Sequence, residues 1–479
     1  MCSGGYLLLA VLCPVIGAFI IPVASLFSSK ARNLLSLLFV LISLVSSILM
    51  APCVLRGCTL NYSIIFPLGF NFVLTADSLA VFMAIVSSFI SAIIVVYSFG
   101  YISHYKNQTE YYTMVVLFLG SMMGLVFSGN LICLYLFWEL TAFASWRLIG
   151  FYREDIHVFR ANKAFLMTVF GALVMLIGFI VIYQETGSFD MAVIKKHYSG
   201  IPINNIVVLM ILFGILSKSA TLPFHTWLPD AGVAPSPVTA LLHAAVLVKI
   251  GVYVFARLLI ATFHYFPEWN TIVAVVAALS ALVSAGAAMI DTDMKRIIAY
   301  STISQIAFIF LGFTAGNAIG IAGALLYILM HGIAKAGLFL CAGIIEQNTK
   351  TKDITKLGGL IKTMPVTALA FLLCAFSVMG IPPFGGFFSK YMVISGMING
   401  GQVAIALVFL TGAIMTILYL FRLFGMVFMG EPKVANAIEG SRIMVMSVAF
   451  LGVLALVSGV LIKYPSQFVS IVVKQMLGA

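Results

Sequence analysis

The sequence predicts an all-α protein that crosses a membrane many times. Of its 479 residues, 62% are hydrophobic and only 9% are charged, and the mean hydropathy is +1.15. Apolar stretches of about 20 residues, the length of a helix that spans a bilayer, recur almost to the C-terminus. Soluble globular domains share neither property. We therefore expect a polytopic all-α protein with a single membrane domain that comprises residues 1–479.

Length and apolarity predict about fourteen transmembrane helices joined by short loops. In chain order the expected spans are 6–27, 33–55, 76–101, 111–128, 130–151, 161–184, 205–226, 236–263, 270–290, 296–315, 318–346, 364–395, 402–429 and 441–463. The first span lacks a basic region before it and a small-residue cleavage site after it. It is therefore expected to be a retained helix and not a signal peptide.

Basic residues gather in every second loop. One set of loops contains Lys30, Arg32, Lys106, Arg153, Arg160, Lys163, Lys295, Arg296, Lys350, Lys352, Lys356, Lys362, Lys433 and Arg442. The other set offers mainly Arg56, Lys195 and Lys196. Because basic loops tend to stay in the cytoplasm, we expect the first set inside the cell membrane and both termini on the outer face. The same rule explains the net charge of +11 without a nucleic-acid partner.

Two of the expected helices contain proline breaks close to an intramembrane lysine. Pro223 interrupts the seventh helix, and Pro382 and Pro383 interrupt the twelfth. Proline removes a backbone donor, and in a membrane the freed carbonyls must be met by protein or water. Paired interrupted helices are typical of transporters with inverted repeats. Because the breaks lie five helices apart, helices four to eight (111–263) and nine to thirteen (270–429) are predicted to form two five-helix repeats, the second inverted.

Ionisable side chains lie inside these apolar helices. Each one costs about 2.5–3.5 kcal/mol at the bilayer centre, and such residues usually mark ion pathways. The expected pathway consists of Glu139, Lys218, His243, Lys249, His331, Lys335 and Lys390. Glu139 and Lys218 are expected to form an ion pair that opens and closes, which would change the affinity of the lysine for a proton. A purely structural ion pair is the alternative for Glu139.

The remaining residues of the pathway are expected to relay protons. His243 can do so because histidine titrates near neutral pH, although a satisfied core histidine is the alternative. His331 and Lys335 are four residues apart and face the same way on a helix. Lys390, near the end of the broken twelfth helix, would be the group on the exit side, with snorkelling of its ammonium to the membrane interface as the alternative.

Five further residues are weaker candidates: His225, Asp230, Asp77, Arg422 and Arg147. His225 and Asp230 flank residues 227–229 and could line an access cavity on the cytoplasmic side, while helix capping explains Asp230 equally well. Arg147, two turns beyond Glu139, is either a second partner for that carboxylate or an interface residue.

The seven cysteines form no CxxC pair, and their spacing fits neither a zinc site nor an iron–sulfur cluster. No cofactor or metal is therefore expected on this chain. A disulfide between Cys53 and Cys58, which share one loop, remains open.

Four stretches carry a family resemblance. They are residues 218–251, 293–305, 331–335 and 387–390. Together they resemble the antiporter-like subunits of respiratory complex I, Mrp-type sodium/proton antiporters and membrane-bound group 4 hydrogenases, over nearly the whole chain. The resemblance implies a core of fourteen helices with two inverted repeats. It also implies that Glu139 and Lys218 are the coupling pair, that Lys249 or His243 is the central relay, and that Lys390 is the terminal lysine.

Two functions remain in competition. The leading one is an ion-translocating, most simply proton-translocating, subunit of a multisubunit redox complex, whose partner subunits would carry iron–sulfur clusters and, in a hydrogenase, a nickel–iron centre. The sequence ends soon after the fourteenth helix without the long lateral helix of the largest such complex I subunit, which favours a ferredoxin-linked membrane hydrogenase. The alternative is a subunit of an Mrp-type sodium/proton antiporter without redox chemistry. Other membrane subunits and lipids are expected partners in both, and the ion stays open between H⁺ and Na⁺.

Overall fold

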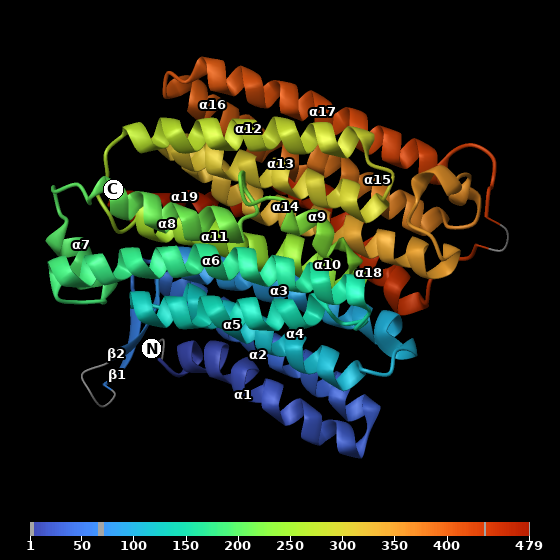
Figure 1. Cartoon of the computed structure of the whole chain (residues 1–479), viewed down its shortest axis with the longest axis horizontal. Coiled ribbons are helices and arrows are strands. Elements are labelled where there is room, and N and C mark those ends of the chain that lie inside the picture. Colours follow the sequence, from blue (N-terminus) through green and yellow to red (C-terminus); the bar gives the residue numbers. More distant parts are fainter. Residues whose placement is uncertain (1–3, 66–70, 435–436, 479) are drawn as a thin grey trace.

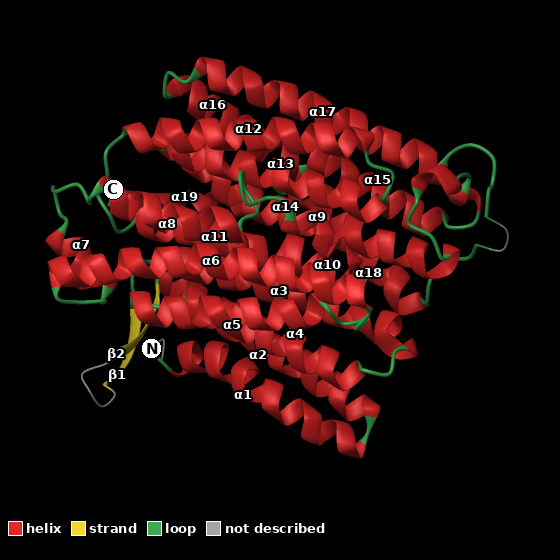
Figure 2. Cartoon of the chain, in the orientation of Figure 1, coloured by secondary structure: helices red, strands yellow, loops and turns green. Residues whose placement is uncertain are grey.

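The computed structural model describes residues 4–65, 71–434 and 437–478. It is an array of long helices that run side by side along one direction, with the loops gathered at the two ends (Figure 1). Helices account for nearly all regular structure in the described chain, and the only sheet among these residues is a two-stranded hairpin (Figure 2). The predicted all-α membrane architecture is therefore confirmed.

Twelve described segments are long and apolar enough to cross a membrane. Eleven of them are single helices: α1 (Gly5–Phe27), α2 (Ser29–Val54), α3 (Ser78–Tyr101), α4 (Gln108–Val126), α5 (Leu131–Ile149), α6 (Asp155–Thr186), α12 (Glu268–Ile290), α13 (Met294–Thr314), α14 (Ala318–Thr349), α17 (Val403–Phe428) and α18 (Arg442–Val460). The twelfth is Ser236–Ile260, called the 236–260 helix below. The expected twelfth helix is split into two shorter ones, and the expected seventh ends before its predicted boundary.

Both proline breaks predicted from the sequence are present. The expected seventh helix, 205–226, ends early as α8 (Asn205–Lys218), and Pro223 lies in the non-helical segment between α8 and the short α9 (Trp227–Asp230). The expected twelfth helix consists of α15 (Pro365–Met379) and α16 (Gly385–Asn399). Gly380, with φ of +82°, ends α15 in a left-handed conformation that glycine adopts without strain. That these broken helices belong to two inverted repeats, 111–263 and 270–429, stays a prediction.

The 236–260 helix is continuous but irregular. It starts as α10 (Ser236–Ala240), passes through a π-helical turn at Leu241–Ala245, continues as α11 (Leu247–Val254) and ends in a second π-helical turn at Phe255–Ile260. Such turns are rare and occur frequently at functional sites. His243 lies in the first of them.

Several elements were not expected from the sequence. They are the antiparallel strands β1 (Leu60–Ile65) and β2 (Asn71–Ala76), the helices α7 (Met191–His197) and α19 (Lys463–Leu477), and 3₁₀ turns at Ile102–His104, Ala231–Val233, Ile354–Lys356 and Leu360–Lys362. α19 follows α18 after a two-residue turn and packs against α14 and α3. The expected last helix, 441–463, therefore covers only the first part of a longer interrupted segment.

The helices differ in how much of their surface is buried. α13, α14 and the 236–260 helix are buried almost all round, whereas α1, α2, α17 and α18 expose many apolar side chains. A helix that is apolar on all sides belongs in the interior. Four residues of the expected pathway, His243, Lys249, His331 and Lys335, therefore lie on helices that other helices shield from lipid.

Candidate functional site

Lys218 is fully buried at the C-terminal end of α8. Its ammonium donates a hydrogen bond to the carbonyl oxygen of Trp138 at 3.2 Å and lies 5.4 Å from the centroid of the Trp138 ring. A carbonyl oxygen and an aromatic face both attract a cation. Trp138 is therefore the direct partner of Lys218 in this structure.

Glu139, the neighbour of Trp138 in α5, acts on Lys218 through its charge, and Tyr135 lies one turn before it on the same helix. The described side chains of Glu139 and Lys218 form no direct ion pair, and one carboxylate oxygen of Glu139 has no hydrogen-bond partner among the described residues. The side chains of Glu139 and Lys218 are thus close enough for their charges to interact, but they do not form the expected direct ion pair in this structure.

Arg147 does not serve as the second partner of Glu139. It binds the carboxylate of Glu110 in α4, which also accepts a hydrogen bond from Arg153 at 2.7 Å. The arginine therefore ties α5 to α4 at the end of the bundle with the basic loops. Of its two interpretations, the partnership with Glu139 is wrong in this structure.

Lys249 occupies the centre of the 236–260 helix and is fully buried. Its ammonium donates to the carbonyl oxygens of Ala244 at 2.5 Å and Ile328 at 3.0 Å. Ala244 belongs to the first π-helical turn, so this irregular turn places a backbone acceptor beside the lysine. Gly332 of α14 makes room for the ammonium, because a Cβ atom at that position would lie 2.9 Å from Nζ of Lys249.

His243 and His331 are both buried, and none of their ring nitrogens has a hydrogen-bond partner within the described part of the chain. The ring of His243 packs against Phe339, with 4.4 Å between the centroids. His331 lies close enough to Lys249, Lys335, His243 and Lys390 for electrostatic interaction with each of them. Buried polar groups without partners are uncommon exceptions that ask for an explanation, so the satisfied-core interpretation does not fit His243.

Lys335 and Lys390 complete the group of buried lysines. Lys335 donates to the carbonyl oxygen of Ile298 at 3.1 Å and to the hydroxyl of Ser301 at 2.6 Å. Lys390 donates to the carbonyl oxygen of Val378 at 2.7 Å, beside the break between α15 and α16. Only 5% of Lys390 is exposed, so its ammonium does not snorkel to the surface of this chain.

His225 and Asp230 lie near the end of the bundle that carries the basic loops. Asp230 at the end of α9 binds Lys163 of α6 at 2.7 Å and Arg296 of α13 at 2.9 Å, so ion pairing between helices explains it. Nδ1 of His225, in the break before α9, is buried without a partner among the described residues. The two side chains therefore have different surroundings, and only His225 keeps a free ring nitrogen there.

A buried ion pair that the sequence did not suggest lies at the same end. Lys295, only 1% exposed, binds Glu346 at 2.8 Å and donates to the carbonyl oxygen of Ala234 at 2.9 Å. Glu346 lines a cavity of about 870 Å³ together with Tyr101 and Tyr152. In the sequence Lys295 looks like an ordinary loop lysine, so its neighbours in the chain do not predict that it is buried.

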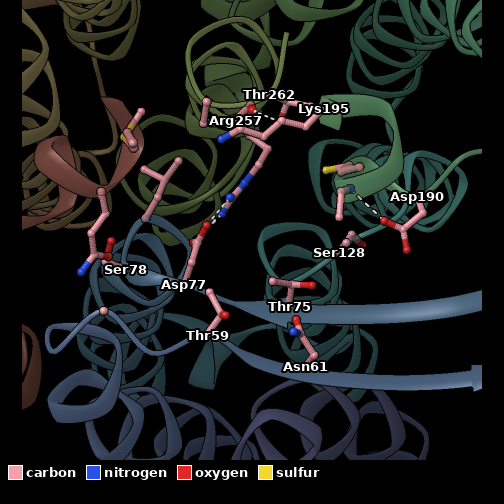
Figure 3. Close-up of a pocket in the computed structure, with 18 residues that line it drawn as sticks. Thr59, Asn61, Thr75, Asp77, Ser78, Ser128, Asp190, Lys195, Arg257 and Thr262 are labelled. Carbon is pink, nitrogen blue, oxygen red and sulfur yellow. Dashed lines mark hydrogen bonds and ion pairs between the residues drawn. The ribbon is translucent and has the colours of Figure 1, made fainter. Parts of the chain in front are cut away.

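The opposite end of the bundle holds a cavity of about 490 Å³. Figure 3 shows Asp77 and Arg257 pointing toward each other in this cavity, where both nitrogens of the guanidinium end bind the carboxylate. Burial acts to raise the pKa of Asp77, but the Arg257 charge and hydrogen bonds from Arg257 and Ala80 together lower it below its ordinary value. Arg257 also donates to the hydroxyl of Tyr253 at 3.0 Å, one turn from Lys249 on the same helix.

The sequence of residues 128–416 matches the family model described as "NADH:quinone oxidoreductase/Mrp antiporter, TM". This segment is more than half of the chain. The chain belongs to the NADH:quinone oxidoreductase/Mrp antiporter family. Residues 65–112 also match the model "NADH-Ubiquinone oxidoreductase (complex I), chain 5 N-terminus". The resemblance expected from the four sequence stretches is confirmed.

Relatives within the family include "Na(+)/H(+) antiporter subunit A1" of Staphylococcus aureus, which is 33% identical over 491 aligned residues. The alignment covers 94% of this chain and 60% of that protein, so the chain spans well under two thirds of the length of this relative.

Two solved structures share the fold over 99% of this chain and 98% of theirs, each at 22% identity. One is the Mrp complex from Dietzia sp. DQ12-45-1b, with a TM-score of 0.88. The other is the membrane-bound sulfane sulfur reductase, an archaeal respiratory membrane complex, with a TM-score of 0.89. The family fold thus occurs in complexes with different tasks.

Proposed function

We propose that this chain is an ion-translocating subunit of a multisubunit membrane complex and that protons are the ions it carries. The observation that supports this most is the way the four buried lysines of the expected pathway are held. Each of the four binds a backbone carbonyl, and none binds the carboxylate of a described residue directly. A buried charge without a partner would cost several kcal/mol. Because no carboxylate of a described residue is bound to these lysines, a lysine that loses its proton does not leave such a charge behind. Such lysines can therefore load and release protons.

An Mrp-type sodium/proton antiporter is our first candidate for the whole complex. It is supported by the identity of 33% to a protein named Na(+)/H(+) antiporter subunit A1. The partners would then be other membrane subunits, and no redox centre would be involved. Lysine and histidine bind protons and not sodium, so we assign the proton to the path described above and leave any sodium site to other residues.

A redox complex is the second candidate and was the first choice from the sequence. It is supported by the fold match to the archaeal respiratory complex, which extends over 98% of that chain. Iron–sulfur clusters, and a nickel–iron centre in a hydrogenase, would then belong to peripheral partner subunits. Purification of the complex through this chain separates the candidates, because redox subunits with iron–sulfur absorbance support the second candidate and small membrane subunits alone support the first.

The proton path is tested by replacing the expected coupling pair. Lys218→Ala and Glu139→Ala should each lower ion transport by about a hundredfold, the size of effect expected when a proton-transfer group is lost. The rate is measured with the purified complex in vesicles that contain a pH-sensitive dye. Lys356→Ala, at an exposed loop lysine, is the matched control and should transport like the wild type. Wild-type rates in both test variants would overturn the proposal.

A further inference from the structure

Five side chains outside the expected pathway connect Lys335 with the neighbourhood of Lys390. Ser301 and Gln305 come from α13, Tyr327 from α14, and Thr416 and Tyr419 from α17. All five are fully buried, and we call them the bridging cluster. The sequence marks none of them, because they are neutral residues within apolar helices.

The first part of the bridging cluster is a run of hydroxyl groups. The ammonium of Lys335 donates to Ser301 at 2.6 Å, and the Tyr419 hydroxyl lies 2.7 Å from Ser301 and 3.3 Å from Thr416. A hydroxyl group both donates and accepts hydrogen bonds. A proton from Lys335 can therefore be handed from oxygen to oxygen as far as Thr416.

Gln305 interrupts this run. Thr416 uses its own hydrogen on the carbonyl oxygen of Gly412 at 2.8 Å, so it can only accept from Gln305, whose amide nitrogen lies 3.2 Å away. The amide oxygen of Gln305 then faces Tyr327, which donates to it at 2.5 Å. A side-chain amide nitrogen donates hydrogen bonds but does not accept them. A proton that reaches Thr416 thus has no onward acceptor on Gln305.

The second part of the bridging cluster lies on the other side of Gln305. The ammonium of Lys390 lies 5.7 Å from the centroid of the Tyr327 ring and 4.7 Å from that of Phe308. The Tyr327 hydroxyl is held by Gln305. Within the bridging cluster, Gln305 therefore contacts both the hydroxyl run from Lys335 and the tyrosine beside Lys390.

We propose that Gln305 is a positioning residue that separates two proton-carrying segments, one from Lys335 to Thr416 and one from Tyr327 to Lys390, and so prevents uncoupled proton flow. The inference rests on the proposed function, in which these lysines carry protons. When the Gln305 side chain turns away, a proton leaves the Lys335 ammonium, which becomes a neutral amine. Water that enters in place of the Gln305 amide then connects Thr416 with Tyr327 and Lys390. Each hydroxyl group and water molecule passes on one proton as it receives one, and a neutral Lys390 amine takes up the last proton and becomes an ammonium, so charge and protons balance.

The test compares Gln305→Glu with Gln305→Met. A carboxylic acid donates from one oxygen and accepts at the other, so it closes the gap, whereas methionine has similar length and carries no proton. In vesicles with an imposed pH gradient and no driving reaction, Gln305→Glu should leak protons about a hundredfold faster than the wild type, the lower end of the effect of one proton-transfer group. Gln305→Met should not leak. Equal leak rates in the two variants would overturn the inference.

A double variant shows whether the leak uses the proposed route. Adding Lys335→Ala to Gln305→Glu should remove the leak, because the proton then has no donor. The proposed function is checked separately by coupled transport in Lys335→Ala alone. Wild-type transport there overturns the function itself, whereas lost transport together with a tight Gln305→Glu variant overturns only the role of Gln305.

A second pair of variants tests the hydroxyl run if Gln305→Glu fails to assemble. Tyr419→Phe keeps the ring but removes the hydroxyl between Ser301 and Thr416, and should slow coupled transport by about a hundredfold. Tyr97→Phe makes the same change at another fully buried tyrosine, which donates to the carbonyl oxygen of Leu340 outside the bridging cluster. Tyr97→Phe should transport like the wild type, and equal rates in both variants would contradict the proposed relay.

Discussion

The four buried lysines of the expected pathway share one chemical environment. Each ammonium lies against a backbone carbonyl oxygen, and the carbonyls belong to Trp138, Ala244, Ile328, Ile298 and Val378. Two of these positions depend on local irregularity, namely the π-helical turn that contains Ala244 and the break that follows Val378. Irregular backbone at membrane depth is tolerated only where it is buried in protein or lines a cavity. Here it supplies acceptors for charged side chains.

Gly332 lies so close to Lys249 that the methyl group of an alanine at this position is predicted to disturb the lysine. Gly332→Ala places a Cβ atom 2.9 Å from Nζ of Lys249 and 3.2 Å from the carbonyl oxygen of Ala244, so the ammonium must move. Misplacement of a reacting group by about 1 Å can cost a hundredfold in rate, and we expect transport to fall by at least about tenfold. Overpacking should cost about 1–3 kcal/mol of stability, measured by thermal unfolding in detergent.

Gly286→Ala is the control for this substitution. Gly286 lies in α12 with open space around it, and alanine there should be neutral or stabilise the helix by about 0.5–1 kcal/mol. If both variants transport at the wild-type rate, the close approach of α14 does not matter for Lys249.

Some of these residues could be predicted from the sequence and others could not, and the difference has a physical reason. A lysine in an apolar stretch is visible because its burial is costly, so Lys218, Lys249, Lys335 and Lys390 could be predicted as buried groups. Gln305 and Tyr419 could not, because a neutral polar residue fits a transmembrane helix without an evident cost. Their importance comes from pairing between helices that are far apart in sequence.

The same contrast holds for whole elements. Proline and glycine predict the two broken helices, and the structure adds that the breaks depend on tight packing. A Cβ atom at Gly386 would lie 1.8 Å from the carbonyl oxygen of Ser377. The π-helical turns have no comparable local signal. The expected spans end at residue 463 and do not include α19, although its buried Val469, Val472, Val473 and Met476 follow a helical spacing.

The Asp77–Arg257 pair joins α3 to the 236–260 helix and predicts how stability depends on pH. Because the pKa of Asp77 is lowered in the folded state, its contribution is present above the unfolded pKa of about 4 and is lost as pH falls through the folded pKa. Asp77→Asn should therefore lower stability by about 2 kcal/mol at pH 7 and remove this part of the acid dependence. Unfolding in detergent between pH 3 and pH 7, a window of about four units, measures both.

Asparagine is a suitable replacement because it also caps helices well. Asp77 accepts a hydrogen bond from the amide of Ala80 at the start of α3, and the amide oxygen of an asparagine side chain would preserve that contact while the charge is lost. If the wild type and Asp77→Asn are equally stable at pH 7, the ion pair of Asp77 with Arg257 does not hold α3 and the 236–260 helix together.

On the scale of the whole molecule, the ionisable residues lie in a shielded interior with a cavity near each end. The cavity of about 870 Å³ adjoins Glu346 at the end with the basic loops, and that of about 490 Å³ adjoins the Asp77–Arg257 pair at the other. Ion pairs of Lys163, Arg296 and Lys352 with aspartates hold the basic loops together. The chain therefore has two ends of different chemistry, as the loop charges predict.

Orientation in the membrane is the last prediction at this scale. The start of α1 and the end of α19 lie at the same end of the bundle as α7, opposite the loops that follow α14 (Figure 1). Because basic loops tend to stay in the cytoplasm, we expect Lys356 inside and Lys196 of α7 outside. Lys196→Cys and Lys356→Cys, each in a background without the seven native cysteines, are treated in intact cells with a membrane-impermeant maleimide. Labelling of the cysteine introduced at Lys196 alone supports this orientation, and labelling at Lys356 alone reverses it together with the direction assigned to the proton path.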